Sequence, residues 1–327
     1  MNELPGLGLF FESWVIFADA VWAGVLAGMT LGILGVYIVL GRMVFLTAAL
    51  SQVAGLGVAA SYLLAATFGS TFGWLSPGIG GLVFVLLCLI FALRFDESDR
   101  TERDAALGML FVGGSAGTLM IGGMIPQEMT DIQSLLFGSA VAVLPEDLSI
   151  IVWVVSLTLL LQFFGWRGFV EMIYDPTTAS VRSLPVNVLR WALVGSLALM
   201  VATTTRMLGA LPTFSFTILP AIVAIRWASN VPRAMMLAAM IGALMGFWGY
   251  FCAFRYGFPV GAAQTAVGLV LVLVSHMSAW LVGCVRSERG TLEAPQPVPH
   301  AHGHAHHHGH QHGSRGADES SSSEGTS

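Results

Sequence analysis

Histidines near the C-terminus are the side chains best suited to binding a metal ion. Eight of the nine histidines in this 327-residue chain are His300, His302, His304, His306, His307, His308, His310 and His312. Neutral imidazole is a common ligand of zinc, nickel and copper. Residues 290–327 have almost no large apolar side chains. We expect a disordered cytoplasmic tail that binds zinc or a similar divalent metal as a buffer or sensor. A tail without a role is the alternative.

A second candidate site is a small, mildly polar helix face around Gln52. Ala48, Gln52, Gly55 and Ala59 recur at spacings of four, three and four, which places them on one face of a helix. Gln52 is the only strong hydrogen-bonding side chain among them. This face could line a substrate pathway between subunits, or it could pack tightly against another helix through the glutamine amide.

Enzymatic chemistry has little support in the sequence. The segment 113–117 matches G-x-S-x-G around Ser115, and His276 is the only histidine outside the tail. A serine hydrolase needs that motif on a strand-to-helix elbow, whereas here it lies in a glycine-rich apolar stretch. All 14 basic residues are arginine, so a P-loop and a Schiff-base site are excluded. We therefore expect no enzyme, and any ATP must bind to a separate subunit.

The amino-acid composition indicates whether water or lipid surrounds these elements. Hydrophobic residues make up 55% of the chain, charged residues 10%, and the mean hydropathy is +0.77. A soluble chain has about 25% charged residues, so this is an integral membrane protein, and an all-α polytopic bundle is expected. The three cysteines have no C-x-x-C spacing. The sequence gives no indication of nucleic-acid binding.

Nine apolar spans follow an external N-terminal segment, residues 1–17. They cover about 18–40, 44–68, 78–94, 104–125, 146–165, 187–207, 211–225, 233–254 and 262–285. The first carries Gly24, Gly28 and Gly32, a ridge that lets another helix approach closely. The segment 134–144 is too short to cross and is expected to be re-entrant. Residues 18–289 form the predicted transmembrane domain.

Arginine placement predicts the orientation. With the N-terminus outside and the C-terminus inside, eleven arginines lie in or beside cytoplasmic connections, and only Arg206 and Arg255 lie outside. Two cytoplasmic stretches are candidates for contact with a partner. One is 174–182, in which Asp175 is placed to cap a short helix, and the other runs from Pro220 to Arg233. Ordinary connecting loops are the alternative.

A series of short motifs occurs along residues 18–280, including R-M, L-S-Q, L-G-V-A and L-F-G. In chain order they are Gly41–Met43, Leu50–Gln52, Leu56–Ala59, Asp104–Met109, Leu135–Gly138, Pro145–Leu148, Asp175–Pro176, Leu208–Leu211, Leu219–Ala221 with Arg226, and Pro259–Gly261. Their order and spacing resemble those of the permease subunits of zinc and manganese ATP-binding cassette importers.

The resemblance implies a multi-pass permease of the bacterial inner membrane that imports a divalent metal ion. Its expected partners are separate ATPase subunits, a second permease subunit in a homo- or heterodimer, and an external substrate-binding protein. The segment from Pro220 to Arg233 would be the coupling helix. The residues expected to couple the chain to the ATPase are Asp175, Arg182, Pro220, Arg226 and Arg233. No cofactor is expected in the core.

The resemblance also places the substrate pathway and shows where this chain departs from the family. The pathway positions are Ala48, Ser51, Gln52, Gly55 and Ser139. Family members usually have Asp and His where this chain has Ala48 and Gln52, and Asp where it has Ser139. A His often found after the D-x-x-x-G block is also replaced, in the neighbourhood of Val112. Neutral side chains are poor ligands for a dehydrating divalent cation.

Three explanations of these departures remain. The chain is the non-coordinating half of a heterodimer, or it carries a different substrate such as a metal chelate or an organic solute. The third explanation is a membrane sensor or scaffold that transports nothing and detects metal through its histidine tail.

Overall fold

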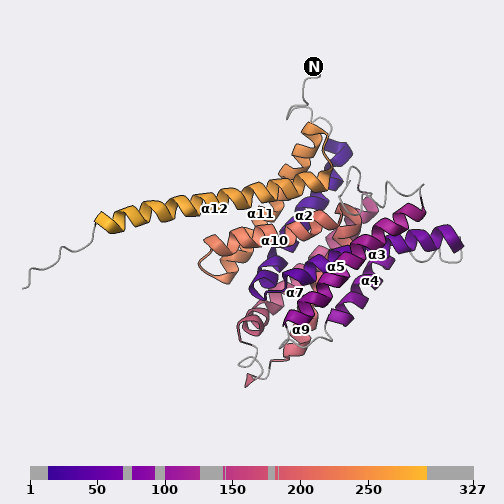
Figure 1. Cartoon of the computed structure of the whole chain (residues 1–327), viewed down its shortest axis with the longest axis horizontal. Coiled ribbons are helices and arrows are strands. Elements are labelled where there is room, and N and C mark those ends of the chain that lie inside the picture. The colour runs from indigo at the N-terminus through magenta and orange to yellow at the C-terminus, as the bar shows by residue number, and fades with distance from the viewer. Residues whose placement is uncertain are drawn as a thin grey trace, which may run out of the picture. The chain divides into compact units, whose positions relative to one another are not determined.

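The computed structural model describes residues 14–68, 76–92, 100–125, 143, 145–175, 181–182 and 184–292. The chain divides into two units, Met1–Trp280 and Leu281–Ser327. The first unit is described below, and of the second only the helical residues 281–292 are described. All regular structure in the described residues is helical (Figure 1), which confirms the all-α prediction.

The described residues form nine helices. They are α2 (Trp14–Leu40), α3 (Val44–Phe68), α4 (Pro77–Ala92), α5 (Arg100–Met124), α7 (Pro145–Tyr174), α9 (Val186–Leu208), α10 (Ala210–Trp227), α11 (Val231–Tyr256) and α12 (Val260–Leu292). Eight of them are long and apolar enough to cross a membrane. The exception, α4, has 16 residues and a length of about 24 Å, less than the ~30 Å hydrocarbon core.

The ends of the bundle differ from the predicted boundaries. Helix α2 begins at Trp14, ahead of the expected start at Ala18, because the Phe17 ring packs 5.1 Å from Phe254 and 5.9 Å from Tyr250 of α11. At the other end, α12 continues past Arg289 to Leu292. The expected re-entrant segment, apart from Val143, lies outside the described residues.

Helix α2 and helix α11 meet backbone to backbone, as the glycine ridge predicts. A Cβ added at Gly28 would collide with the carbonyl group of Gly242, and one added at Gly246 would lie 2.5 Å from the carbonyl oxygen of Gly24. The next contact along the ridge is Gly32 with Ala238, where an added Cβ would lie 2.6 Å from the carbonyl oxygen. The glycine ridge that the sequence pattern predicted is thus a backbone contact of α2 with α11.

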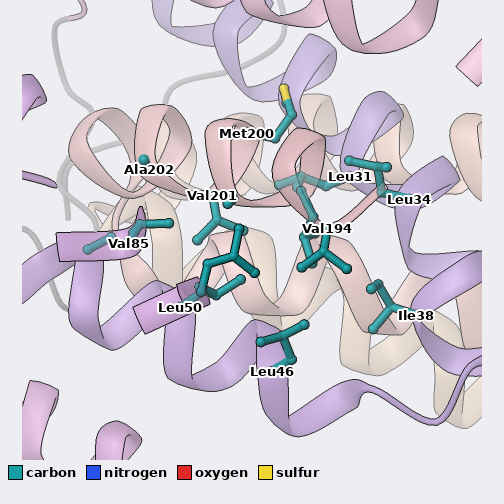
Figure 2. Close-up of a cluster of buried hydrophobic side chains, with 14 of the residues drawn as sticks. Leu31, Leu34, Ile38, Leu46, Leu50, Val85, Val194, Met200, Val201 and Ala202 are labelled. Carbon is teal, nitrogen blue, oxygen red and sulfur yellow. The ribbon is translucent and has the colours of Figure 1, made fainter. Parts of the chain in front are cut away.

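The other side of α2 enters the main apolar core. Figure 2 shows Leu31, Leu34 and Ile38 of α2 beside side chains from α3, α4 and α9. Leu50 of α3 and Val194 of α9 are among its fully buried members. Helix α2 is therefore covered by glycine contacts on one side and by interdigitated aliphatic side chains on the other.

A tight corner joins α9 to α10 through Gly209 alone. This residue has φ 102°, a conformation that side-chain-bearing residues rarely adopt, and its N–H donates to the Thr205 carbonyl at 3.0 Å. Helix α10 therefore starts at Ala210, directly after α9. The corner fixes where α10 crosses α2.

Adding one methyl group to the ridge should destabilise the fold. Gly28→Ala places a Cβ against the Gly242 carbonyl, and overpacking of this kind costs about 1–3 kcal/mol. The matched control is Gly195→Ala on α9, where an added Cβ meets nothing within 4 Å. Thermal unfolding in detergent should show a lower Tm for Gly28→Ala and an unchanged Tm for Gly195→Ala. Equal Tm values would contradict the backbone contact.

Candidate transport site

The predicted face of α3 lies against α5. A Cβ added at Gly114 of α5 would lie 2.9 Å from the backbone carbonyl carbon of Gln52, and one at Gly55 would lie 3.7 Å from Thr118 Oγ1. Ala48 and Gly55 are buried. At Gln52 and Gly55 the structure therefore shows a close helix contact, which is made by the Gln52 backbone and not through its amide oxygen. The role of this face in a substrate pathway stays a prediction.

The polar groups of this face differ in their hydrogen bonding. Ser51 donates its hydroxyl hydrogen to the Ala48 carbonyl at 2.9 Å, and Thr118 donates to the Gly114 carbonyl at 2.7 Å. Gln52 Oε1 is buried and has no hydrogen-bond partner among the described residues. A buried amide oxygen without a partner costs about 1–3 kcal/mol, so Gln52 retains an unused acceptor next to the α3–α5 contact.

Metal ligands are scarce in the described part of the chain. Within it, no group of three or more His, Cys, Asp or Glu side chains is placed to hold a metal ion. Ser139 and all eight tail histidines lie outside the described residues. The described core offers neutral oxygen atoms such as Gln52 Oε1.

The hydrolase alternative fails on geometry. Residues 113–117 lie within the continuous helix α5, so Ser115 is not on a strand-to-helix elbow. His276 Nδ1 lies 3.0 Å from the Val272 carbonyl of its own helix. The motif is a glycine-rich helical segment, and Gly114 within it provides the close approach to α3.

The expected coupling segment consists of a buried part and an exposed part. Pro220 lies inside α10 and is buried, with its Cβ facing Gly32 of α2, so it does not belong to a surface. Arg226 and Arg233 are exposed at either side of the α10–α11 corner. Asn230 caps α11 by accepting a hydrogen bond from the Arg233 N–H at 3.0 Å.

The two exposed arginines of this corner have different surroundings. The Arg233 guanidinium donates to Ser229 Oγ at 2.6 Å and so helps to hold the turn. Arg226 makes no hydrogen bond or ion pair within the described residues. Of the pair, Arg226 is the side chain left available to a partner.

The other predicted coupling residues lie at the end of α7. Arg182 and Glu171 form an exposed ion pair with an N–O distance of 3.3 Å. The Asp175 N–H donates to the Glu171 carbonyl at 2.9 Å, which closes the helix. The short helix that Asp175 was expected to cap lies outside the described residues. Exposed pairs of this kind contribute little to stability, so Arg182 remains a candidate for contact with a partner.

One ion pair was not recognised in the sequence. Arg206 in the last turn of α9 lies 3.0 Å from Asp147 in the first turn of α7, and their side chains are 29% and 18% exposed. Each charge also complements the dipole of its own helix. Arg206 is one of only two arginines on the predicted external side of the bundle. An arginine in that position, with no other basic residue nearby, was the sequence signal for an acidic partner.

Helix α12 is tied to α10 and α11 by polar contacts that the sequence did not reveal. Ser215 and Thr265 hydroxyls lie 3.1 Å apart, and the Trp227 indole N–H donates to Ser275 Oγ at 2.8 Å. Gln264 Nε2 donates to the Gly246 carbonyl at 3.4 Å. These bonds position α12 beside the corner that carries Arg226.

Comparisons with known proteins agree with this architecture. The model of the ABC 3 transport family matches residues 13–279, so the chain belongs to that family. It is 25% identical to the manganese transport system membrane protein MntC of Halalkalibacterium halodurans, over 82% of this chain and 90% of that one. It is 26% identical to the manganese import system permease protein ScaB of Streptococcus parasanguinis, over 80% and 90%.

A solved structure shares the fold. PsaBC from Streptococcus pneumoniae, in complex with Fab, superimposes with a TM-score of 0.72 at 23% identity, covering 83% of this chain and 95% of that chain. Family membership and the eight apolar helices make the chain a multi-pass transport permease of the bacterial inner membrane. The family resemblance inferred from the motifs is thereby confirmed.

Removing the acid of the Arg206–Asp147 pair should weaken the bundle. Asp147→Asn leaves a partly buried guanidinium without its counter-charge, and we expect a loss of about 1–3 kcal/mol. Arg206→Gln in the same chain should recover part of that loss, because the two side chains interact directly. Thermal unfolding of the two single variants and the double variant measures this coupling. Strictly additive effects would show that the pair contributes nothing.

Proposed function

We propose that the chain is the permease subunit of an ATP-binding cassette importer for a divalent metal ion, manganese or zinc. The observation that carries the proposal is the family match over residues 13–279, together with relatives that are named for manganese transport. Manganese is therefore the first candidate. The absence of lysine from the sequence supports ATP binding by a separate subunit.

The missing ligands support a division of labour within a permease dimer. Crossing the membrane requires a divalent ion to lose water, and this needs anionic or imidazole ligands in compensation. Ala48, Gln52 and Ser139 are neutral, and the described residues contain no acidic or imidazole cluster. We infer that a second, different permease subunit supplies the charged ligands and that an external binding protein delivers the ion.

Transport in a reconstituted system tests the proposal. The chain would be co-expressed with candidate ATP-binding cassette ATPase and second permease subunits from the same organism, purified as a complex and placed in proteoliposomes. We expect ATP-dependent accumulation of radioactive manganese that requires this chain. Uptake of a metal chelate or an organic solute instead would assign a different substrate. A complex that transports nothing but still binds zinc through the tail would support the sensor alternative.

The core alone should not bind a bare divalent ion. In calorimetry, the chain lacking residues 290–327 should bind neither zinc nor manganese, whereas the full chain should bind zinc through its tail histidines. Deleting the tail should leave detergent stability unchanged, because its composition buries nothing. Tight, stoichiometric binding by the truncated chain would refute the division of labour.

A designed variant provides the positive control for that measurement. Ala48→Asp with Gln52→His places a carboxylate and an imidazole one helical turn apart in the truncated chain. We expect this pair to gain zinc binding and zinc-dependent thermal stabilisation. The isosteric neutral pair, Ala48→Asn with Gln52→Asn, should gain neither.

Coupling to an ATPase should depend on Arg226. Arg226→Glu replaces an exposed cation by an anion, so a contact with an acidic groove would become repulsive. We expect loss of ATPase co-purification or of transport, with an unchanged Tm. Arg42→Glu, which changes an exposed arginine in the α2–α3 turn, serves as the matched control. Normal assembly and transport by Arg226→Glu would show that the corner is only a connection.

A further inference from the structure

An apolar groove runs between α7 and α9, away from the α3 face. It has a volume of about 400 Å³, within the range of about 300–1,000 Å³ typical of ligand sites. Its walls are formed by Leu157, Leu160, Leu161 and Phe164 of α7, with Leu189 and Ala192 of α9. No polar side chain lines it, so its occupant must be apolar over the length of the groove.

Small residues and a fixed aromatic ring create the hollow. Gly165 adds no side chain to the α7 wall, and a Cβ there would lie 2.6 Å from the Phe169 ring. Phe169 is 1% exposed and meets the edge of the buried Tyr37 ring, with centroids 5.8 Å apart. Packed residues therefore form the floor of the groove, while its outer wall consists of exposed side chains of α7.

A cation lies close to the groove along α7. Arg167 follows Phe164 by one helical turn, is exposed, and has its guanidinium carbon 5.4 Å from the centre of the Trp166 ring. It forms no ion pair with a carboxylate in the part of the chain that the structure describes, since the nearby Glu171 pairs with Arg182. Tryptophan and arginine together are typical of the membrane–water interface.

We propose that this groove binds one anionic phospholipid, with an acyl chain along the apolar walls and the phosphate at Arg167. A basic site between transmembrane helices at the cytoplasmic surface is a common arrangement for anionic headgroups. The position of Arg167 on the arginine-rich side of the bundle assigns the lipid to the inner leaflet. This site is separate from the α3 face, and it does not depend on which substrate is transported.

A flexible chain fits the groove better than a partner helix does. Close helix contacts in this protein bring a glycine against the backbone of the other helix, as Gly28 against Gly242. The lip of this groove instead carries Phe163 and Phe164, which are 75% and 77% exposed and pack edge to face at 5.5 Å. Two protruding rings keep a second backbone at a distance, whereas a lipid chain can follow the space between them.

Native mass spectrometry of the full chain in detergent tests the proposal. Titrations would use phosphatidylglycerol, phosphatidylcholine with the same acyl chains, and glycerol phosphate without chains. A single cation at the surface favours an anionic lipid by about fivefold, so we expect phosphatidylglycerol to bind about fivefold more tightly than phosphatidylcholine. Glycerol phosphate should not bind. Equal affinity for the two lipids, or binding of glycerol phosphate alone, would overturn the proposal.

Variants separate the two halves of the site. Arg167→Gln should remove the preference for phosphatidylglycerol, about fivefold, and leave phosphatidylcholine unaffected. Ala192→Phe should fill the groove and weaken both lipids. Leu160→Trp is the second groove-filling variant, for use if Ala192→Phe does not fold, and it should also weaken both lipids. The Leu160 side chain is 56% exposed, so a larger side chain is tolerated there. Arg42→Gln is the control for an exposed arginine elsewhere and should bind both lipids as the wild type does.

Two further outcomes would also overturn the site. The proposal is wrong if Arg167→Gln and Arg42→Gln reduce binding equally, or if neither groove-filling variant changes it. A photo-reactive amino acid at Leu160 should cross-link to lipid in cells. Cross-linking to another protein subunit instead would assign the groove to a partner helix.

Discussion

Glycines on α2 and α11 bring two helix backbones into direct contact, and the packing of the described bundle follows from that approach. In hydrocarbon there is no hydrophobic force between helices, so van der Waals contact and hydrogen bonds must hold them together. At Gly28 and Gly242 there is no room for even one methyl group. With one side of α2 fixed in this way, its opposite side presents Leu31 and Leu34 to the core shared with α3, α4 and α9 (Figure 2).

Polar side chains add further links between the helices. Helix α12 approaches α10 through the Ser215–Thr265 contact and the Trp227–Ser275 hydrogen bond. Arg206 and Asp147 join α7 to α9 at one end of the bundle. These contacts give a hydrogen-bonding or ionic partner to polar groups that would otherwise lie away from water without one. Each contact also links two different helices. The bundle thus combines small-residue contacts around α2 with a few polar links at its periphery.

The sequence was informative wherever a feature depends on a single helix. Hydropathy located the spans, and the four-residue spacing of Gly24, Gly28 and Gly32 identified a ridge for close approach. It could not identify the partner of that ridge, because Gly242 and Gly246 lie more than two hundred residues away on α11. For the same reason it left open whether the Gln52 face lines a pathway or packs against a helix. The positions of Gly114 and Thr118 in the structure show that α5 lies on it.

The uncharged interior limits how a divalent ion can use this chain. Gln52 Oε1 and Gln264 Oε1 are buried acceptors without partners among the described residues, yet both are neutral. An amide oxygen can accept a hydrogen bond from water in the hydration shell of an ion, but it cannot replace the charge that a stripped ion requires. On the proposed function, such groups can orient a partly hydrated ion, while anionic ligands must come from another subunit. The neutral side chains at the predicted pathway positions are then what makes the second permease indispensable, since two such halves would leave the ion uncompensated at membrane depth.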